Sequence, residues 1–394
     1  MSRRQGVDAA VVGGGVVGAA AALALARAGL EVALVEATLP SPWRSDRPDL
    51  RVFAFAADNA ALLDSLGAWD AVREARLHPY RRMRVWDAAG GGELKFDADA
   101  FGRRELGWIV ENALLADRLW AALGAAGVRV HAPARVVALE SGDEDDFARL
   151  RLDDGSQLQA RIAIAADGAQ STLRELAGLL VERHDYGQRG VVGYVGTQHG
   201  HEDTAWQRFL PTGPLAFLPC GDGSSSIVWT LPDAEAARVL ALDDAAFGRE
   251  LTRAFDARLG DARPLSPRAA FPLRRQLVDR YVSGRVLVLG DAAHVVHPLA
   301  GQGVNLGLRD VSALAAMVDA ANRDRGDWAA PSRLARWARE RRSENTLAAH
   351  AFDGINRVYT GDGVATTLLR GPLLGLAGRL PPVAHFLWKR AAGL

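Results

Sequence analysis

Three glycines near the start of the chain, Gly13, Gly15 and Gly18, have the G-x-G-x-x-G spacing of a dinucleotide-binding turn, and Glu36 follows them. In such a turn the first glycine lets the backbone reverse tightly, and the second admits a pyrophosphate to the start of a helix. The third glycine lets the helix pack closely on its strand, and the acidic residue accepts hydrogen bonds from ribose hydroxyls. The chemistry that these residues predict is the binding of a dinucleotide.

The segments around these glycines have the patterns that are needed to position them. An apolar run at residues 7–12 predicts a buried strand, and residues 17–28 predict a helix that ends at Gly29. Residues 31–35 predict a second strand, so the turn lies inside a βαβ unit. This context makes the glycine fingerprint specific, because the unpaired N–H groups at the start of a helix attract phosphate.

A second glycine-rich stretch runs from Gly290 to Asp310, directly after the apolar run 285–289. That run predicts a buried parallel strand, which would place Asp291 at the strand's carboxyl end, where α/β sheets bind ligands. A helix is predicted from residue 304 to about residue 318. The N–H groups at its start suit an electron-rich ring that develops negative charge. Taken alone, this stretch fits an ordinary strand, turn and helix equally well.

The middle of the chain has a different pattern. Residues 83–95 predict a hairpin and residues 128–139 a strand, and a further strand at 157–165 leads into Asp167. Between about residues 190 and 231, short apolar runs alternate with proline and glycine turns, which favours an antiparallel sheet. Residues 234–259 are predicted to be helical. An antiparallel sheet between βα segments indicates a second domain.

The composition excludes several classes of protein. The 394 residues include 47 basic and 47 acidic ones, so the net charge of zero gives no electrostatic case for nucleic-acid binding. Cys220 is the single cysteine, which excludes an internal disulfide and fits a reducing compartment. Glycines interrupt the apolar stretch near the N-terminus, which argues against a signal peptide and for a cytoplasmic protein.

In combination, the motifs resemble those of flavoprotein monooxygenases of the para-hydroxybenzoate hydroxylase class. That class has a glycine fingerprint, an internal Asp-Gly motif and a later Gly-Asp motif. The last two are matched here by Asp167-Gly168 and Gly290-Asp291. The implied fold is α/β, with a Rossmann-like FAD-binding domain, an inserted antiparallel or mixed β-sheet substrate domain and a C-terminal helical segment.

Within this class the chain is similar to the FAD-dependent hydroxylases of ubiquinone biosynthesis (UbiH type). The similarity rests on four features and extends from end to end. These are residues 49–52 (DLRV), Glu111-Asn112, residues 287–308 with their HPLAGQGVNLG core, and a helix at 337–342 together with Asn356. It implies an FAD-binding domain at 1–180 and 271–330, a substrate domain at 181–270 that is joined by a hairpin at about 80–100, and a helical region at 331–394.

The resemblance also implies roles for individual residues. Glu36 would bind the adenosine ribose, Arg51 and Asn112 would flank the pyrophosphate and ribityl chain of FAD, and Asp291 would hold a ribityl hydroxyl. Asp167 and Arg174 would lie where reduced nicotinamide dinucleotide approaches. The implied cofactor-binding residues are Gly13, Gly15, Gly18, Glu36, Arg51, Asn112, Asp167, Asp291, Gly301, Gln302, Gly303, Val304 and Asn305.

The implied reaction is hydroxylation of the ring of a polyprenylated phenol or benzoquinone precursor through a flavin C4a-hydroperoxide. The implied cofactors are FAD and, as reductant, NADPH or NADH, with O2 as co-substrate. Backbone N–H groups from Gly301 to Asn305 would stabilise the anionic reduced flavin. Pro298 and Gly301 would position the substrate at the flavin face, and no general base is assigned.

Other functions remain open on the sequence. A small soluble aromatic could be the substrate, or the chain could be a prenyl reductase or an FAD-containing scaffold of a quinone-biosynthesis complex. A halogenase is disfavoured because the segment nearest to its Trp-x-Trp-x-Ile-Pro motif, residues 227–232, has one tryptophan. Asp291, His294 and His297 could be read as a metal triad, but their glycine-rich surroundings suit a planar cofactor better, and no metal is predicted.

The last segment, residues 363–394, contains no acidic residue and combines basic with large apolar side chains. It fits a helix that covers the core. It equally suits the surface of an anionic bilayer, where a polyprenyl substrate would reside, so the protein could be peripheral on the inner membrane.

Overall fold

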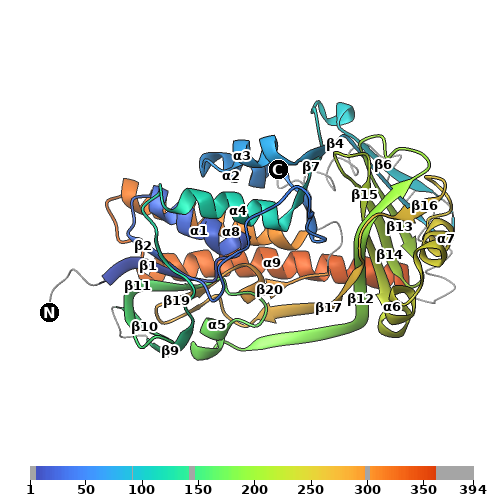
Figure 1. Ribbon diagram of the computed structural model, residues 1–394. Helices are drawn as coiled ribbons and strands as arrows, with labels where there is room; N and C mark the ends of the chain where they lie inside the picture. The colour runs from blue at the N-terminus through green and yellow to red at the C-terminus, as the bar shows by residue number, and fades with distance from the viewer. Residues whose placement is uncertain (1–5, 91, 142–146, 298–301, 361–394) are drawn as a thin grey trace.

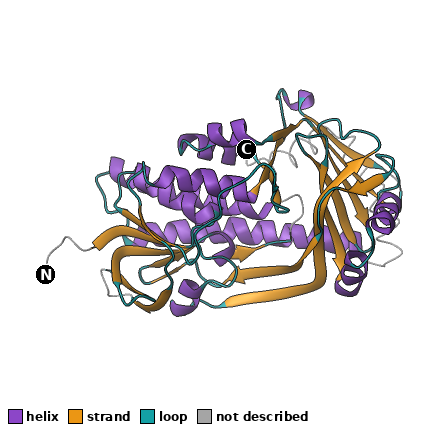
Figure 2. Ribbon diagram, viewed as in Figure 1, coloured by secondary structure: helices purple, strands orange, loops and turns teal. Residues whose placement is uncertain are grey.

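The computed structural model describes residues 6–90, 92–141, 147–297 and 302–360. Two sheets lie at opposite ends of the molecule, and helices fill the space beside and between them (Figures 1 and 2). The long strands β12 (Val181–Thr197) and β17 (Ala269–Val278) run from one end toward the other. Because these strands extend between the two ends, the structure gives no sharp boundary between FAD-binding, substrate and C-terminal parts, and the predicted division of the chain remains a proposal.

The first sheet has a parallel centre. Its strands follow the order β19 (Val286–Val288), β11 (Gln157–Ala165), β1 (Gly6–Val12), β2 (Val32–Val35) and β8 (Arg129–His131). The register sets Val12 opposite both Ala165 and Val35, and Ala165 opposite Val288. Because parallel strands point the same way, the segments that follow them all leave at one edge of the sheet.

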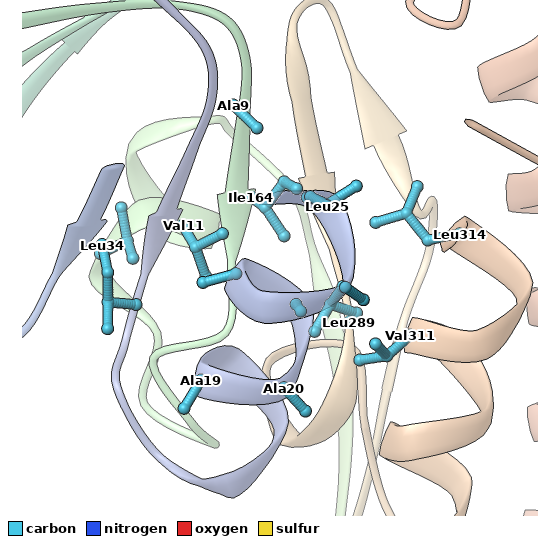
Figure 3. Packing of buried hydrophobic residues seen from close by; sticks show 14 of the residues in the cluster. Ala9, Val11, Ala19, Ala20, Leu25, Leu34, Ile164, Leu289, Val311 and Leu314 are labelled. Atoms are coloured by element: carbon cyan, nitrogen blue, oxygen red, sulfur yellow. The ribbon is translucent and has the colours of Figure 1, made fainter. Parts of the chain in front are cut away.

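Small side chains allow close packing on this sheet. Helix α1 (Val16–Arg27) buries a run of alanines, among them Ala19 and Ala20, which have no exposed surface (Figure 3). It packs against α4 (Asn112–Leu123) and α8 (Gln302–Arg323), whose Val311 and Leu314 are also buried. Burial on both sides explains why the central strands are apolar runs rather than alternating ones.

The turn between β1 and α1 depends on glycine. Gly13 has φ +104°, in the region that other residues rarely adopt, and a Cβ atom on it would lie 2.4 Å from the carbonyl oxygen of Ala166. A Cβ atom on Gly18 would lie 1.9 Å from the carbonyl oxygen of Gly13. Gly18 therefore acts where the sequence predicted, as the residue that lets helix and strand approach.

The second sheet is mixed. Its order is β20 (His294–Val295), β17, β12, β15 (Ser225–Pro232), β14 (Gly213–Pro219), β13 (Thr204–Leu210), β5 (Arg82–Asp87) and β6 (Glu93–Asp97). The neighbours are antiparallel except β13 and β5, which are parallel. The predicted hairpin is thus present as β5 and β6, and it extends the sheet built from residues 181–278.

Side-chain alternation gives this sheet two different faces. One face, with Val191, Phe217 and Trp229, forms a core with α6 (Asp233–Leu240) and α7 (Asp244–Ala254), which lie on its outer side in Figure 1. Residues one position away on the same strands point to the opposite side, toward the interior of the molecule.

The remaining elements complete the layers around the two sheets. The longest helix, α9 (Pro331–Thr360), packs on α8 and reaches β13 and β14 of the second sheet. The others are β3 (Val52–Phe55), α2 (Ala57–Ser65), α3 (Trp69–Ala75), β4 (His78–Tyr80), the 3-10 turn Asp99–Phe101, β7 (Gly107–Glu111), β9 (Val136–Glu140), β10 (Ala148–Leu152), α5 (Thr172–Leu176), β16 (Ala262–Pro264), β18 (Val282–Ser283) and the 3-10 turn Gly290–Ala292. Of the helices described, none is both long and apolar enough to cross a membrane.

Three predicted elements differ in extent. The strand predicted at 128–139 is two strands, β8 and β9, separated around Pro133, which lacks the N–H that a ladder needs. The helix predicted at 234–259 is α6 and α7, because the Asp243 side chain accepts a hydrogen bond from Ala246 N (2.7 Å) and begins a new helix. Helix α8 covers Gln302–Arg323, beyond the predicted 304–318.

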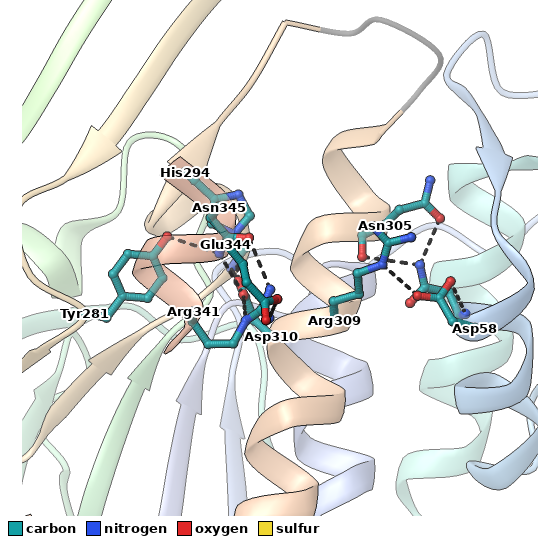
Figure 4. A network of polar contacts seen from close by, with 11 residues as sticks. Asp58, Tyr281, His294, Asn305, Arg309, Asp310, Arg341, Glu344 and Asn345 are labelled. Atoms are coloured by element: carbon teal, nitrogen blue, oxygen red, sulfur yellow. Dashed lines mark hydrogen bonds and ion pairs between the residues drawn. The ribbon is translucent and has the colours of Figure 1, made fainter. Parts of the chain in front are cut away.

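A buried carboxylate joins the Gly-Asp loop to α8 and α9. Asp310 on α8 has no exposed surface and accepts hydrogen bonds from Gly290 N (3.0 Å), Arg341 Nε (2.8 Å) and Asn345 Nδ2 (2.9 Å), and it contacts His294 Nε2 (2.7 Å) (Figure 4). Burial alone would raise the pKa of Asp310, but the attraction of His294 and Arg341 and these hydrogen bonds hold it below the ordinary value of 3.8. The ionised carboxylate thus fixes the loop that carries Asp291.

We expect Gly18→Ala to lower the free energy of unfolding by about 1–3 kcal/mol and to reduce retention of the predicted FAD, because the added methyl group displaces the glycine turn. Gly124→Ala is the control, since a Cβ atom there meets nothing within 4 Å. Urea unfolding and the ratio of flavin to protein absorbance measure the two effects. If the two variants showed the same free energy of unfolding and the same ratio of flavin to protein absorbance, the packing role of Gly18 would be contradicted.

We expect Asp310→Asn to cost about 3–5 kcal/mol of stability near neutral pH, because Arg341 and His294 would lose a buried partner. A depressed pKa stabilises the fold above the unfolded value of 3.8, and this contribution is lost as the pH falls through the lower folded value. The wild type and the variant should therefore converge in acid. Unfolding midpoints across pH, with the exposed Asp64→Asn as control, test this; a gap that is independent of pH would show that packing rather than charge is responsible.

Candidate functional site

A cavity of about 1950 Å³ lies between the carboxyl edge of the parallel sheet and the inner face of the second sheet. The three sequence motifs follow β1, β11 and β19, so they reach this cavity from neighbouring strand ends. The predicted cofactor-binding residues that line it are Gly13, Gly15, Glu36, Arg51, Asn112, Asp167, Asp291, Gly303 and Val304.

The glycine turn leaves room for a ligand at the start of α1. Gly15 is the N-cap residue, no side chain caps the helix, and a Cβ atom on Gly15 would meet nothing within 4 Å. The carboxylate of Glu36 accepts hydrogen bonds from Gly14 N (2.5 Å) and Thr38 N (2.9 Å), which fixes it beside the turn. Uncapped N–H groups next to an oriented carboxylate suit a pyrophosphate and a ribose.

A carboxylate organises the loop that bears Arg51. Asp49 accepts hydrogen bonds from Arg51 N (3.0 Å), Asn112 Nδ2 (3.3 Å) and Ala113 N (3.0 Å), which joins the loop to the start of α4. The guanidinium of Arg51 lies 5.3 Å from the centre of the Phe271 ring, on the second sheet. Its charge therefore faces the cavity between the two sheets, where it could bind phosphate oxygens.

Asp291 lies in the 3-10 turn Gly290–Ala292, three residues after the end of β19, and its side chain is exposed to the cavity although protein surrounds it on the other sides. Those surroundings raise the pKa of Asp291 by desolvation, and His294 and Arg51 partly offset the effect. A carboxylate that opens onto the cavity on one side can accept hydrogen bonds from a ligand's hydroxyl groups.

The beginning of α8 forms another wall. Gln302 is its first residue, and Gly303 and Val304 line the cavity. Asn305 is fully buried behind them: its Oδ1 accepts from Ala56 N (3.0 Å) and its Nδ2 donates to Ala54 O (2.8 Å), which anchors the helix start to β3. Pro298 and Gly301, predicted to lie at the flavin face, are outside the described residues.

The Asp-Gly loop differs from the expected arrangement. Asp167 lines the cavity, but its carboxylate also accepts hydrogen bonds from the Ser171 hydroxyl and from Leu173 N (3.1 Å), so it caps α5. The Arg174 side chain has no exposed surface and donates to the carbonyl oxygens of Ala169 (3.1 Å) and Ala292 (3.0 Å). Arg174 therefore ties two loops together and has no surface on the cavity, and the predicted approach of a reduced dinucleotide near it stays a prediction.

The two histidines of the Gly-Asp loop are both buried. His294 is held by Asp310, as described above, while neither ring nitrogen of His297 has a hydrogen-bond partner among the described residues. Desolvation lowers the pKa of His297 to about 4, so this side chain is neutral near pH 7. Among the described residues, Asp291, His294 and His297 are not a group whose ligand atoms all lie within 4.8 Å of one another, so the loop offers a poor metal triad.

The inner face of the second sheet was missed by the sequence motifs. Apolar side chains dominate it, and they come from alternate positions of β5, β6, β13, β14 and β15. The sequence pattern that could have indicated this wall is the alternation of side chains within each strand. That pattern defines two faces, but the sequence alone does not say which face lines the cavity. The residues of this wall are Met83, Val85, Leu94, Phe96, Ala205, Gln207, Phe209, Ala216, Leu218, Val228 and Thr230.

The donor set fits FAD. An uncapped helix start beside an oriented Glu36 suits the dinucleotide half, Arg51 supplies positive charge for the phosphates, and Asp291 accepts hydroxyl groups. The start of α8 adds partial positive charge toward the ring. The cavity also exceeds the ~300–1000 Å³ of an ordinary ligand pocket, so it can hold a cofactor and a second ligand.

Comparison with known proteins agrees with this geometry. The family described as FAD binding domain matches residues 6–350. The 3-demethoxyubiquinol 3-hydroxylase of Escherichia coli (strain K12) is 39% identical over 392 residues, which cover 99% of either chain. Ubiquinone hydroxylase UbiL of Rhodospirillum rubrum is 37% identical over 388 residues, covering 98% of this chain and 89% of that one.

The fold is also found in solved structures. PqsL of Pseudomonas aeruginosa, in complex with 2-aminobenzoylacetate, is 25% identical with a TM-score of 0.75, covering 90% of this chain and 97% of that chain. The family match, the relatives and the cavity lead to one conclusion. The chain is an FAD-dependent monooxygenase and belongs to the hydroxylases of ubiquinone biosynthesis, within the para-hydroxybenzoate hydroxylase class.

Proposed function

We propose that this enzyme hydroxylates the aromatic ring of a polyprenylated phenol or benzoquinone precursor of ubiquinone, with O2 and a reduced nicotinamide cofactor. The observation that carries the proposal is the polarity of the cavity. One end is lined by the glycine turn, Glu36, Arg51 and Asp291, whereas the other end is almost entirely apolar. A cofactor with phosphates and a substrate with a hydrocarbon tail match these two ends.

The apolar end, which we call the apolar arm, lies under the β5–β6 hairpin and beside α9. Phe209 stacks on Tyr359 with ring centres 3.9 Å apart, so β13 and the end of α9 close together over it. A small, soluble aromatic acid would leave this surface in contact with water, which is unfavourable. The apolar arm consists of Met83, Val85, Leu94, Phe96, Leu106, Phe209, Phe352 and Tyr359.

The residues of the chain have distinct tasks in this reaction. The chemistry that FAD supplies when it is bound is the reduction of O2 and the transfer of one oxygen atom to the ring. Asp291 and Asn112 orient the cofactor, and the N–H groups at the start of α8 stabilise negative charge on its ring. The apolar wall of the second sheet excludes water from the ring of the substrate.

We propose NADPH or NADH as the reductant. The sequence has one glycine fingerprint, which the FAD site uses, so the reductant would bind without a Rossmann domain of its own. The side chain of Arg174 is buried, so we do not assign it a contact with the reductant. Arg51 remains exposed on the cavity and is a candidate contact for a second set of phosphates.

Phenols that carry one, two or three isoprene units test the substrate class. We expect kcat/KM to rise at least about tenfold with each unit until the apolar arm is filled, because each buried CH2 group contributes about 0.8 kcal/mol. Mass spectrometry of the product formed under ¹⁸O2, together with oxidation of NADH or NADPH, measures the reaction.

The control substrate is 4-hydroxybenzoate, which has the ring without the tail. Equal turnover of this acid and of the prenylated phenols would favour a small soluble substrate. A bound flavin that is reduced but never yields a hydroxylated product would favour the reductase or scaffold alternatives.

We also propose that residues 363–394 bring the enzyme to an anionic membrane surface, where it could join other proteins of quinone biosynthesis. Support comes from the sequence alone: Arg370, Arg379, Lys389 and Arg390 lie among large apolar side chains, and no acidic residue occurs in the segment. These residues are outside the described part of the chain.

Replacing these four basic residues by Glu should weaken binding to phosphatidylglycerol vesicles by more than about tenfold, since each basic residue near such a surface contributes about 1 kcal/mol. Co-sedimentation measures the binding. The control reverses four exposed arginines elsewhere, Arg149, Arg151, Arg249 and Arg253. Equal loss in both variants would indicate a general charge effect, and no loss in either would exclude the segment as an anchor.

A further inference from the structure

One side chain on the inner wall of the second sheet does not fit its surroundings. Gln207 on β13 is 7% exposed, and that remaining surface faces the cavity. No hydrogen bond joins its side-chain amide to the described part of the chain. By contrast, two other buried amides, Asn59 and Asn305, form a hydrogen bond with each other. The amide atoms of Gln207 are not among the buried unpaired atoms, so they open onto the cavity, where they can bond to whatever fills it.

The neighbours of Gln207 cannot satisfy it. In the sheet it pairs with Val85 of β5 on one side and Ala216 of β14 on the other. Along its own strand, the residues two positions away on the same face are Ala205 and Phe209. All four are apolar, so a partner for the amide has to come from the cavity itself.

The position of Gln207 connects the two ends of the proposed substrate. Phe209, two residues further along β13, belongs to the apolar arm, where the hydrocarbon tail would lie. An amide carries both an N–H donor and a carbonyl acceptor, so it can bond to a phenol, an ether or a quinone oxygen. Hydrogen bonding at this place would fix the rotation of a ring whose tail is already held.

We propose that Gln207 binds an oxygen substituent on the aromatic ring of the substrate and thereby sets which ring carbon faces the flavin. The inference rests on the proposed function, since it assumes a prenylated, oxygen-bearing ring. It adds a specificity-determining residue that lies far in sequence from the flavin motifs. With the tail in the apolar arm and one oxygen on Gln207, the ring has two fixed points and a single orientation.

The test compares a prenylated phenol with the same prenylated benzene that lacks the hydroxyl group. The preference is the ratio of the affinity for the phenol to the affinity for the prenylbenzene. We expect Gln207→Leu, and Gln207→Met as a second variant of similar length, to reduce this ratio about tenfold, because one hydrogen bond is lost. Affinity for the prenylbenzene should change less than about twofold. Equilibrium binding by flavin fluorescence gives both affinities, and the fraction of reductant that yields hydroxylated product should fall in parallel.

Gln157→Leu, the same substitution at an exposed strand position outside the cavity, is the matched control. Thermal unfolding should show that Gln207→Leu is about as stable as the wild type, because the amide has no hydrogen bond to the described residues that the substitution would break. Variants that keep the wild-type preference for the phenol would overturn the inference and leave a bound water as the partner of the amide, with the proposed function intact. A wild-type enzyme that binds neither ligand would overturn both.

Discussion

The site depends on the alignment of parallel strand ends at one edge of a sheet. Because Val12, Ala165 and Val288 are in register, segments separated by more than a hundred residues in sequence begin side by side. Asp310 on α8 then fixes the third of these segments by accepting hydrogen bonds from Gly290 N and from two residues of α9, Arg341 and Asn345. The buried charge is tolerated because each of its oxygens has a partner, which is the condition for keeping a carboxylate away from water.

The second sheet adds a wall whose two faces differ in what covers them. Helices α6 and α7 occupy the outer face, so the alternate residues are left toward the cavity. A wall made of Val, Leu and Phe excludes water and accepts a hydrocarbon, and the hairpin β5–β6 and α9 extend it at one end. The same wall makes the amide of Gln207 conspicuous, because it opens onto the cavity between apolar neighbours on both adjoining strands.

The arrangement separates charge from hydrocarbon within one cavity. Phosphate-binding and hydroxyl-binding groups gather at the parallel sheet, where helix starts and carboxylates are available, while the second sheet offers almost no charge. A reaction that moves oxygen from a flavin to a ring benefits from such a division, since the reacting atoms meet at the boundary and water is kept out of the apolar half.

The sequence by itself determined the βαβ unit and the role of Gly18, because both depend on local spacing and on backbone constraints that only glycine meets. FAD was implied by the resemblance of its three motifs to those of flavoprotein monooxygenases. It also predicted the hairpin β5–β6 from its turn. Only the tertiary structure decided that Arg174 is buried and bonds two loops together, that Asn305 anchors a helix and that Gln207 faces the cavity. The physical reason is that burial and the inward face of a strand are set by what packs on the other side, which no local pattern contains.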